Sequence, residues 1–337
     1  MSKFFRILSI DGGGIRGIIP ARILMTLEEK LQTVTNDPDK RLSDFFDLIA
    51  GTSTGGILTC IYLFPDSEDP QRSGFNAQAA LEIYLNRGHE IFHIPVWQKV
   101  KSGAGILDEK HRLDGLEAAL NDYLQDRKLS ELIKPCLITS YNIERRAAFF
   151  FTQHDARQDA SRDFLLRDVA RATSAAPTFF ECADVKSATQ VSYPMIDGGV
   201  FANNPALCAY AEARTMEDAQ KPTAKQMVIL SLGTGAVKTP YHFDAAKDWG
   251  AVQWIRPVLD IIMSGVAETV DYQLKRIFDA AEATEQYLRI QPQLPPERAD
   301  MDNAKPTNLE ALHEIGRKMA DDNDERLDAF VQLLVAS

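Results

Sequence analysis

The segment Gly51-Thr-Ser-Thr-Gly-Gly-Ile57, directly after the apolar run Phe45–Ala50, constrains the fold more than any other part of the chain. The apolar run predicts a buried strand, and the residues after Ser53 predict a helix. G-x-S-x-G at a strand-to-helix turn exposes the serine Oγ, and Gly51 and Gly55 allow the backbone to pack closely there. A Gly/Ser/Thr turn without chemistry is the alternative, and the rest of the sequence decides between the two.

Short apolar runs alternate with helical patterns along the 337 residues. Strands are predicted over residues 5–10, 45–50, 136–141, 147–152, 191–196 and 227–232, and helices over 18–34, from 53 onward and over 167–173. Strands separated by helices favour a largely parallel sheet with helices on both faces. The polar stretches 65–76 and 292–305 are predicted to be loops, so we expect one domain spanning residues 1–337.

The composition argues against several classes of function. A net charge of −11 does not fit a protein that binds nucleic acid polymers or adheres electrostatically to anionic lipid, so any membrane contact must be local and apolar. The cysteines lack a C-x-x-C pair and predict neither a zinc site nor disulfides: they are Cys60, Cys136, Cys182 and Cys208. Without a signal-peptide pattern or a membrane-spanning run, we expect a cytoplasmic protein with buried free thiols and no metal or cofactor.

The first predicted strand ends in the glycine-rich turn Asp11-Gly-Gly-Gly-Ile-Arg-Gly17. Residues 12–17 satisfy G-x-G-x-x-G, the pattern of dinucleotide-binding turns, which also needs an acidic residue at the end of a second strand about 20 residues on. That distance falls on Asp37 and Asp39 in a polar loop, where no strand is predicted to end. The sequence therefore does not favour a nicotinamide or flavin site.

The same glycines fit a second purpose. Consecutive glycines can direct several backbone N–H groups toward one anion, which is what an oxyanion requires. Gly12, Gly13 and Gly14 are the candidate donors, and Arg16 adds positive charge beside them unless it is a plain surface arginine.

A serine nucleophile needs a base, and in a Ser–Asp–His order the histidine comes late in the chain. The two late histidines, His242 and His313, lie in polar sequence typical of a surface. Asp197 fits better, because Met195-Ile-Asp-Gly-Gly-Val200 places it at a predicted strand end, where parallel sheets gather their sites. An Asp-Gly turn with a structural carboxylate is common. Beside the other two turns, the residues nevertheless favour a Ser53–Asp197 dyad.

These motifs resemble the patatin-like phospholipase family. Its glycine-rich D-G-G-G-x-R-G loop, G-x-S-x-G elbow and later D-G-G/A are met in order by Asp11–Gly17, Gly51–Gly55 and Asp197–Gly199. Further similar blocks are Ser174-Ala-Ala-Pro-Thr-Phe-Phe180, Ser231-Leu-Gly-Thr-Gly235 and, in the plant patatin branch, Tyr287-Leu-Arg-Ile-Gln291. The resemblance covers nearly the whole chain and is weakest from about residue 64 to 115.

The resemblance implies a three-layer α/β/α fold with a mostly parallel central sheet. It also implies a serine lipid acyl hydrolase of the phospholipase A type, with Ser53 as nucleophile, Asp197 as base and an acyl-enzyme intermediate. The glycine loop with Arg16 would surround the oxyanion, without a catalytic histidine. The expected partners are membrane phospholipids, met at the inner membrane surface.

Regulation stays open at this point. Bacterial members of the family include anti-phage effectors that cyclic oligonucleotides switch on, and the compact length suits such a protein. It suits a constitutive cytosolic lipase or esterase equally well, and a non-catalytic protein that binds anions is the third alternative.

Two other features have more than one interpretation. A basic cluster fits a solvated face or a site for lipid or cyclic-nucleotide phosphate, and consists of Lys99, Lys101, Lys110 and Arg112. The helix predicted over 252–278 has an apolar stripe that fits core packing, a cap, or self-association into a homo-oligomer.

Overall fold

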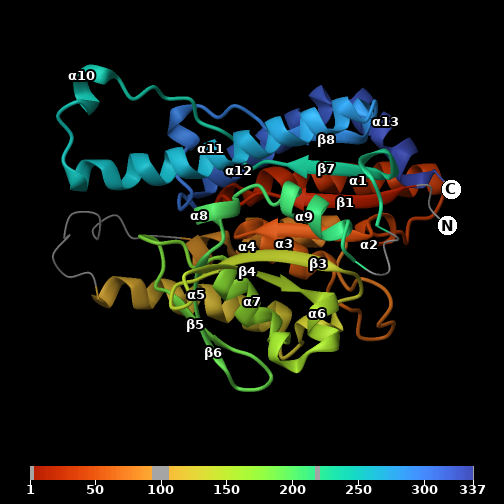
Figure 1. Ribbon diagram of the computed structural model, residues 1–337, viewed down its shortest axis with the longest axis horizontal. Coiled ribbons are helices and arrows are strands. Elements are labelled where there is room, and N and C mark those ends of the chain that lie inside the picture. The colour runs from red at the N-terminus through yellow and green to blue at the C-terminus, as the bar shows by residue number, and fades with distance from the viewer. Residues whose placement is uncertain (1–3, 93–105, 217–220, 337) are drawn as a thin grey trace.

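Eight strands form one sheet through the middle of the computed structural model, which describes residues 4–92, 106–216 and 221–336 (Figure 1). The strands are β1 (Phe5–Ile10), β2 (Leu48–Thr52), β3 (Cys136–Asn142), β4 (Ala147–Thr152), β5 (Ala183–Lys186), β6 (Ser192–Asp197), β7 (Met227–Leu232) and β8 (Tyr287–Ile290). Their order is β5-β6-β3-β2-β1-β7-β8, with β4 also paired to β3. Five neighbouring strands, from β8 at the edge through β7, β1 and β2 to β3, are parallel, and β4, β5 and β6 form the antiparallel end.

The helices cover both faces of this sheet. They are α1 (Ile18–Thr35), α2 (Leu42–Phe45), α3 (Thr54–Tyr62), α4 (Ala77–Phe92), α5 (Ile106–Leu124), α6 (Gln153–Gln158), α7 (Leu166–Thr173), α8 (Gly199–Ala202), α9 (Ala206–Ala213), α10 (Phe243–Ala246), α11 (Ala251–Ala280), α12 (Pro306–Asp322) and α13 (Asp324–Val335). The predicted α/β fold with a mostly parallel central sheet between helical layers is confirmed. Among the helices described, none is long and apolar enough to cross a membrane.

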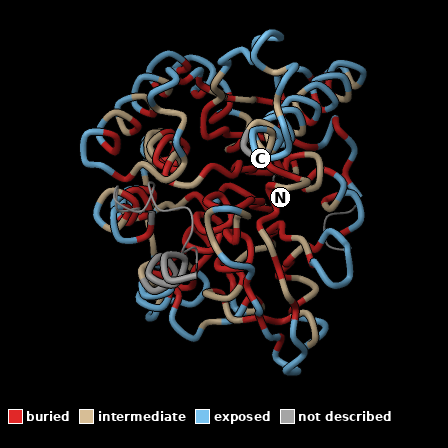
Figure 2. The backbone as a smooth tube through the Cα atoms, turned by 90° about the vertical axis from the view of Figure 1, so that its left-hand side faces the viewer, coloured by how far each residue is buried: buried red, intermediate tan, exposed pale blue. Residues whose placement is uncertain are grey.

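Alternate side chains of the central strands pack into two separate cores. Leu8 and Ile10 of β1 join the larger core with helices α1, α3, α4, α5, α7, α12 and α13, whereas Ile7 joins a smaller core with α9 and α11. This alternation is the period of a strand buried on both faces. Buried backbone accordingly fills the centre of the molecule and exposed backbone its rim (Figure 2).

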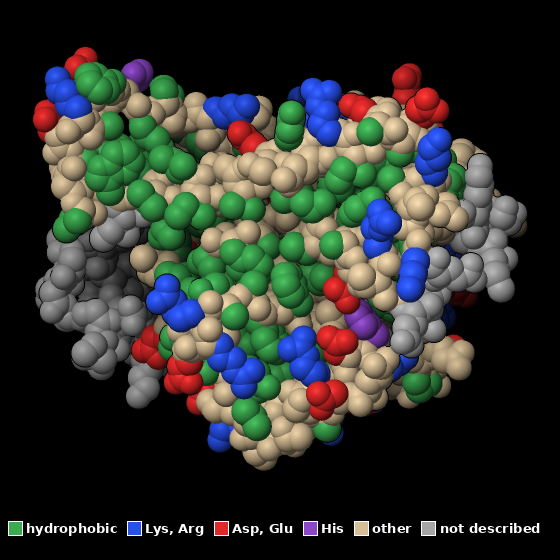
Figure 3. All heavy atoms as spheres, in the orientation of Figure 1, with side chains coloured by type: hydrophobic (Ala, Val, Ile, Leu, Met, Phe, Trp, Pro, Cys, Tyr) green, Lys and Arg blue, Asp and Glu red, His purple; other side chains and the backbone are tan. Residues whose placement is uncertain are grey.

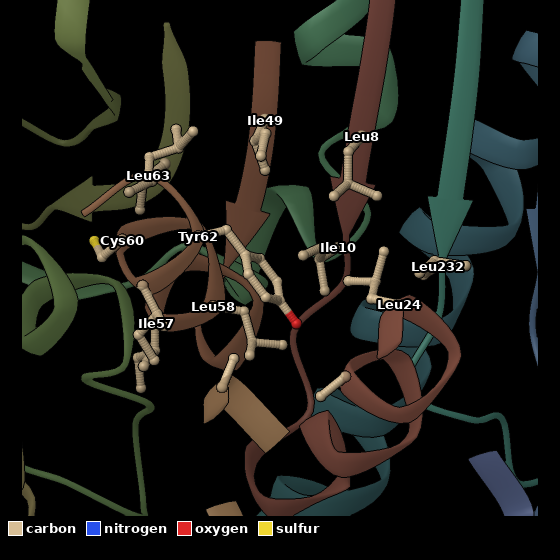
Figure 4. Close-up of a cluster of buried hydrophobic side chains, with 14 of the residues drawn as sticks. Leu8, Ile10, Leu24, Ile49, Ile57, Leu58, Cys60, Tyr62, Leu63 and Leu232 are labelled. Carbon is tan, nitrogen blue, oxygen red and sulfur yellow. The ribbon is translucent and has the colours of Figure 1, made fainter. Parts of the chain in front are cut away.

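The larger core closes around the helix that begins at the predicted serine turn. Tyr62 of α3 extends its ring between Leu58 of the same helix and residues of β1 and β2 (Figure 4). Every residue of α3 is buried, including Thr54 and Thr59. The turn before α3 is thus held between a buried strand and a buried helix.

Two local predictions were wrong. Phe45 ends the short helix α2 rather than starting a strand, because the Asp44 carboxylate accepts the Arg41 N–H at 2.9 Å and so caps that turn. The strand itself is shifted to Leu48–Thr52. The four cysteines are free, but of the thiols expected to be buried only Cys60 and Cys136 are so, while Cys208 is half-buried and Cys182 exposed.

A buried carboxylate joins the starts of two helices to α1. Glu28 accepts the N–H of Leu42 at 3.0 Å and of Ala77 at 2.8 Å, the first residues of α2 and α4. Both N–H groups belong to helix ends that offer them no partner within the helix. Glu28 therefore ties three helices of the larger core together.

We expect Glu28→Gln to lower the free energy of unfolding by roughly 1–3 kcal/mol, because the amide keeps one acceptor oxygen and leaves one buried N–H unbonded. Urea denaturation measures the change. Glu29→Gln, at the exposed neighbouring position of the same helix, is the matched control. An equal loss in both variants would contradict this role for Glu28.

Candidate active site

Ser53 forms the turn between β2 and α3 with φ 54° and ψ −121°, a conformation that L residues rarely adopt. Two glycines make the turn possible. A Cβ on Gly51 would lie 2.1 Å from the Gly55 carbonyl oxygen, and one on Gly55 would lie 2.1 Å from the Ile10 carbonyl oxygen. The Ser53 N–H donates to Thr173 Oγ1 at 2.9 Å, which anchors the strained residue.

The strands that end beside Ser53 and Asp197 lie on the same side of β3 and run in opposite directions. On one side of β3, Thr52 of β2 pairs with Thr139, and Asp197 of β6 pairs with the next residue, Ser140. The other side of β3 is occupied by β4, so β2 and β6 share one side and end against each other. The expectation that Asp197 ends a parallel strand was wrong: β6 is antiparallel to β3, and this reversal brings the two strand ends together.

Ser53 and Asp197 are in direct contact and nearly shielded from solvent. The Ser53 hydroxyl lies within hydrogen-bonding reach of the Asp197 carboxylate, and the Gly199 N–H donates to Asp197 Oδ1 at 2.7 Å. Burial raises the pKa of Asp197 to about 6, and these two contacts limit the rise. The carboxylate is therefore ionised at neutral pH and more basic than an ordinary aspartate, whose pKa is about 4.

The glycine loop lies beside Ser53 with two of its carbonyl groups held by side chains. Thr234 Oγ1 donates to the Gly12 carbonyl at 2.6 Å, and Arg16 Nε donates to the Gly13 carbonyl at 3.3 Å. In a trans peptide the N–H points away from the C=O, so these bonds turn the N–H groups of Gly13 and Gly14 to the opposite side. Neither N–H has a partner among the described residues. Both glycines line a cavity with Ser53, where they can bind an oxyanion.

Gly12 has a different role from the one its sequence predicted. Its N–H already donates to the Asn203 carbonyl at 3.1 Å, so it cannot serve as an oxyanion donor. A Cβ on Gly12 would lie 2.6 Å from Asn203 Oδ1 and 3.2 Å from Ser53 Cβ. The missing side chain of Gly12 thus lets the loop lie close to Ser53. Of the three glycines predicted to donate to an oxyanion, only Gly13 and Gly14 have free N–H groups among the described contacts.

Arg16 lies at the cavity wall, half-buried, as the source of positive charge that the sequence predicted. Burial lowers its pKa to about 10, which leaves the guanidinium charged at neutral pH. Its second contact, from Nη1 to the Gly235 carbonyl at 3.5 Å, directs the side chain along the glycine loop. The structure thus brings Ser53, Asp197, Gly13 and Arg16 to one place.

A family model described as patatin-like phospholipase matches residues 8–210, which include the glycine loop, Ser53 and Asp197. The chain belongs to the patatin-like phospholipase family. Patatin-like protein 2 of Oryza sativa subsp. indica is 34% identical over 353 residues, covering 97% of this chain and 86% of that protein. Probable inactive patatin-3-Kuras 1 of Solanum tuberosum is 30% identical over 358 residues, covering 99% and 93%. The crystal structure of VipD from Legionella pneumophila shares 12% identity at a TM-score of 0.37, over 95% of this chain and 67% of that one.

Family membership supports hydrolysis of lipid acyl esters as the activity of this chain. One relative of similar extent is named inactive, so the geometry of the dyad in this patatin-like chain must carry the argument for catalysis. In this chain the serine turn, the buried Asp197 carboxylate and the two unpartnered N–H groups of the glycine loop line one cavity. No histidine is among the described residues that line it.

Sequence reasoning missed the counterion of Asp11, the first residue of the patatin-like glycine loop. Arg289 of β8, 278 residues away, donates to Asp11 Oδ1 at 2.8 Å and to Ser231 Oγ at 2.8 Å. Both ions are buried, with Asp11 1% and Arg289 7% exposed. This ion pair fixes the start of the loop to the ends of β7 and β8. The similarity of residues 287–291 to plant patatins was the available signal, but nothing in the sequence paired Arg289 with Asp11.

The patatin-like site opens into a cavity of about 500 Å³ with largely apolar walls. Apolar walls beside the serine suit an acyl chain. Several parts of the chain supply them, among them α3 with Ile57, the segment after α7 with Phe179 and Phe180, and α11 with Leu259, Ile262 and Met263.

The two halves of α11 lie in different surroundings. One fits the predicted core packing, and the other lies beside the cavity, as a cap would. The second half of α11 buries Val270, Leu274 and Phe278 in the smaller core. Its first half forms a wall of the cavity and stays partly exposed. The basic cluster lies outside this description: Lys99 and Lys101 fall outside the described residues, as do the side chains of Lys110 and Arg112.

The pKa of Asp197 predicts how activity depends on pH. Asp197 must be ionised to take the Ser53 proton, so kcat/KM on a soluble short-chain ester should level off above about pH 7 and fall about tenfold per pH unit below about 6. Steady-state rates across this range measure it, with Asp197→Asn giving the background. A wild-type profile that stays flat through pH 6 would contradict Asp197 as the base.

Thr234→Val tests whether the loop carbonyls must be held. Valine keeps the shape of threonine but cannot donate to the Gly12 carbonyl, so the Gly13 N–H loses its fixed direction. We expect kcat to fall roughly tenfold with KM nearly unchanged, a fraction of the loss from deleting a donor. Thr234→Ser, which retains the hydroxyl, is the matched control. Equal kcat values in wild type and both variants would rule out this positioning role.

Proposed function

We propose that this chain is a serine lipid acyl hydrolase of the phospholipase A type that cleaves membrane phospholipids through the Ser53–Asp197 dyad. The observation that carries the proposal is the contact between the Ser53 hydroxyl and a buried carboxylate whose pKa lies near 6. The neighbouring free N–H groups of Gly13 and Gly14 and the apolar cavity support it.

The proposed reaction has two halves. Ser53 Oγ attacks the ester carbonyl carbon while Asp197 accepts its proton, and Gly13 and Gly14 donate to the oxyanion. The tetrahedral intermediate then expels the lysolipid alkoxide, which takes the proton from Asp197 and leaves an acyl-enzyme. In the second half water attacks the acyl carbon, Asp197 takes the water proton, and that proton returns to Ser53 as the fatty acid leaves.

Burial of Asp197 accounts for a mechanism without histidine. Its pKa of about 6 approaches the ordinary value of about 6.5 for histidine. The carboxylate can therefore act as a base of nearly the strength that a histidine would supply. It also contacts the serine directly, so no second residue is needed to relay the proton.

Polar atoms at the reactive end of the cavity suit the rest of a glycerolipid. Ser174 and Asn203 line the cavity, and their buried side-chain oxygens have no hydrogen-bond partner among the described residues. Buried polar atoms of this kind are costly unless they are satisfied. We infer that a bound ester and its glycerol oxygens or hydroxyls supply the missing contacts.

The proposal covers two forms of control. The enzyme is either a constitutive lipase or a bacterial anti-phage effector that a cyclic oligonucleotide switches on. In both forms its substrates lie in a membrane, with which it associates peripherally. A protein that only binds anions on its glycine loop is the rival hypothesis.

Fatty acid release from mixed phospholipid vesicles tests the proposal. Wild type, Ser53→Ala and Asp197→Asn are compared with and without a panel of cyclic di- and trinucleotides. We expect both variants to release fatty acid at least about 10³-fold more slowly than wild type. Ser9→Ala is the matched control, because it removes a buried hydroxyl that has no partner among the described residues.

Each outcome decides something. Release that needs Ser53 but no nucleotide establishes a constitutive lipase, and release that needs one nucleotide establishes a regulated effector. No release under any condition, together with no labelling of Ser53 by a fluorophosphonate, would overturn the proposal in favour of the anion-binding protein.

A further inference from the structure

Exposed apolar side chains gather on one projecting part of the molecule. Six of the ten large hydrophobic residues that are exposed in the described chain fall between residues 241 and 262. They are Tyr241, Phe243, Val252, Val258, Ile261 and Ile262, of which Phe243 is 78% and Val252 82% exposed. This segment comprises α10 and the first half of α11, which extend past the end of the sheet (Figure 1). In the space-filling view, hydrophobic side chains gather below α10 at the upper left (Figure 3).

Aromatic rings hold this segment together. Trp249 contacts Tyr241 and Trp254 edge-on, with ring centroids 5.6 and 5.0 Å apart. The Tyr241 hydroxyl donates to Asp260 of α11 at 3.1 Å. Tryptophan and tyrosine, with an apolar body and a polar edge, favour the boundary between lipid and water. The cluster is therefore chemically suited to lie at the headgroup level of a bilayer.

The exposed face continues into the catalytic cavity. Ile262 is 40% exposed and also lines the cavity that contains Ser53, as do its neighbours Leu259 and Met263. A lipid leaving a bilayer at this face would reach the serine along apolar side chains. A second protein copy seated there would instead cover this route.

The charge of this segment and of the whole chain indicates which kind of membrane surface it can bind. The segment from 241 to 262 contains three acidic and two basic residues, and the whole chain carries a net charge of −11. Neither attracts an anionic membrane, so binding energy must come from burial of apolar surface.

We propose that α10 and the first half of α11 bind the enzyme to zwitterionic phospholipid bilayers by inserting Phe243, Val252 and the apolar face of α11. This inference rests on the proposed function, because it names the surface through which the membrane substrate is met. Insertion of this kind does not depend on ionic strength, unlike adhesion through a basic patch.

Binding is tested in a protein that cannot hydrolyse its target. Ser53→Ala protein is mixed with phosphatidylcholine vesicles, and co-sedimentation is measured at low and high salt. Adding Phe243→Ser and Val252→Ser should weaken binding at least about tenfold, since both side chains lose apolar area for burial. The matched control adds Val34→Ser and Val191→Ser, at positions 47% and 42% exposed elsewhere on the molecule, and should bind like the parent.

The outcomes distinguish this surface from the proposed function. Parent-like binding by the Phe243→Ser/Val252→Ser protein, or binding that high salt abolishes, would overturn the surface. The proposal would also be overturned if the two substitutions converted a dimer to a monomer in sedimentation while vesicle binding was retained. That result would identify the surface as a contact between two copies of the chain.

Hydrolysis is judged separately, in the background that retains Ser53. There the ratio of vesicle to soluble-ester activity should fall about tenfold in the Phe243→Ser/Val252→Ser variant. Absence of all hydrolysis would contradict the proposed function, while vesicle binding would still decide the surface.

Discussion

Two strands that run in opposite directions end against each other on one side of β3, and the active site depends on this meeting. Thr52 and Asp197 pair with consecutive residues of β3, so Ser53, which directly follows Thr52, lies beside Asp197. Backbone ladders fix positions more firmly than a flexible loop, and a dyad with only two members has no third residue to correct its geometry. The antiparallel end of an otherwise parallel sheet is thus what brings Ser53 and Asp197 together.

The second dependence is on burial, which acts on the two ends of the site in different ways. At Asp197, exclusion of water raises the pKa, and the Gly199 N–H keeps that rise within the range where the group is still ionised at neutral pH. At the glycine loop, burial of the Asp11 carboxylate away from water would cost free energy if it were unpaired. Arg289 balances this charge where β1, β7 and β8 end. Side chains of the protein bind the Gly12 and Gly13 carbonyls and the Asp11 carboxylate. The N–H groups of Gly13 and Gly14 have no partner among the described residues and are therefore available to a ligand.

Local signals in the sequence predicted most of the fold and most of the residues that the structure brings together at the candidate site. Ser53, Gly51, Gly55 and the glycine loop each follow an apolar run, and a strand followed by a glycine turn can be recognised within about ten residues. The direction of β6 relative to β3 could not be predicted, because a short buried strand can have the same composition whether it pairs in parallel or antiparallel. The Asp11–Arg289 pair and the use of the Gly12 N–H by Asn203 depend on contacts between distant segments, which spacing along the chain does not encode.

The helix α11 shows why an apolar stripe alone does not specify burial. One continuous stripe covers both halves, yet only the second half, with Leu274 and Phe278, packs against the sheet. The first half extends beyond the sheet, where none of the described strands covers it, and Trp249 packs against Trp254 there. An apolar face that stays uncovered works against solubility, which selection tolerates where the face meets a partner. Its continuity with the cavity at Ile262 fits the proposal that a lipid bilayer is this partner: one helix would then stabilise the core with its second half and face the substrate with its first.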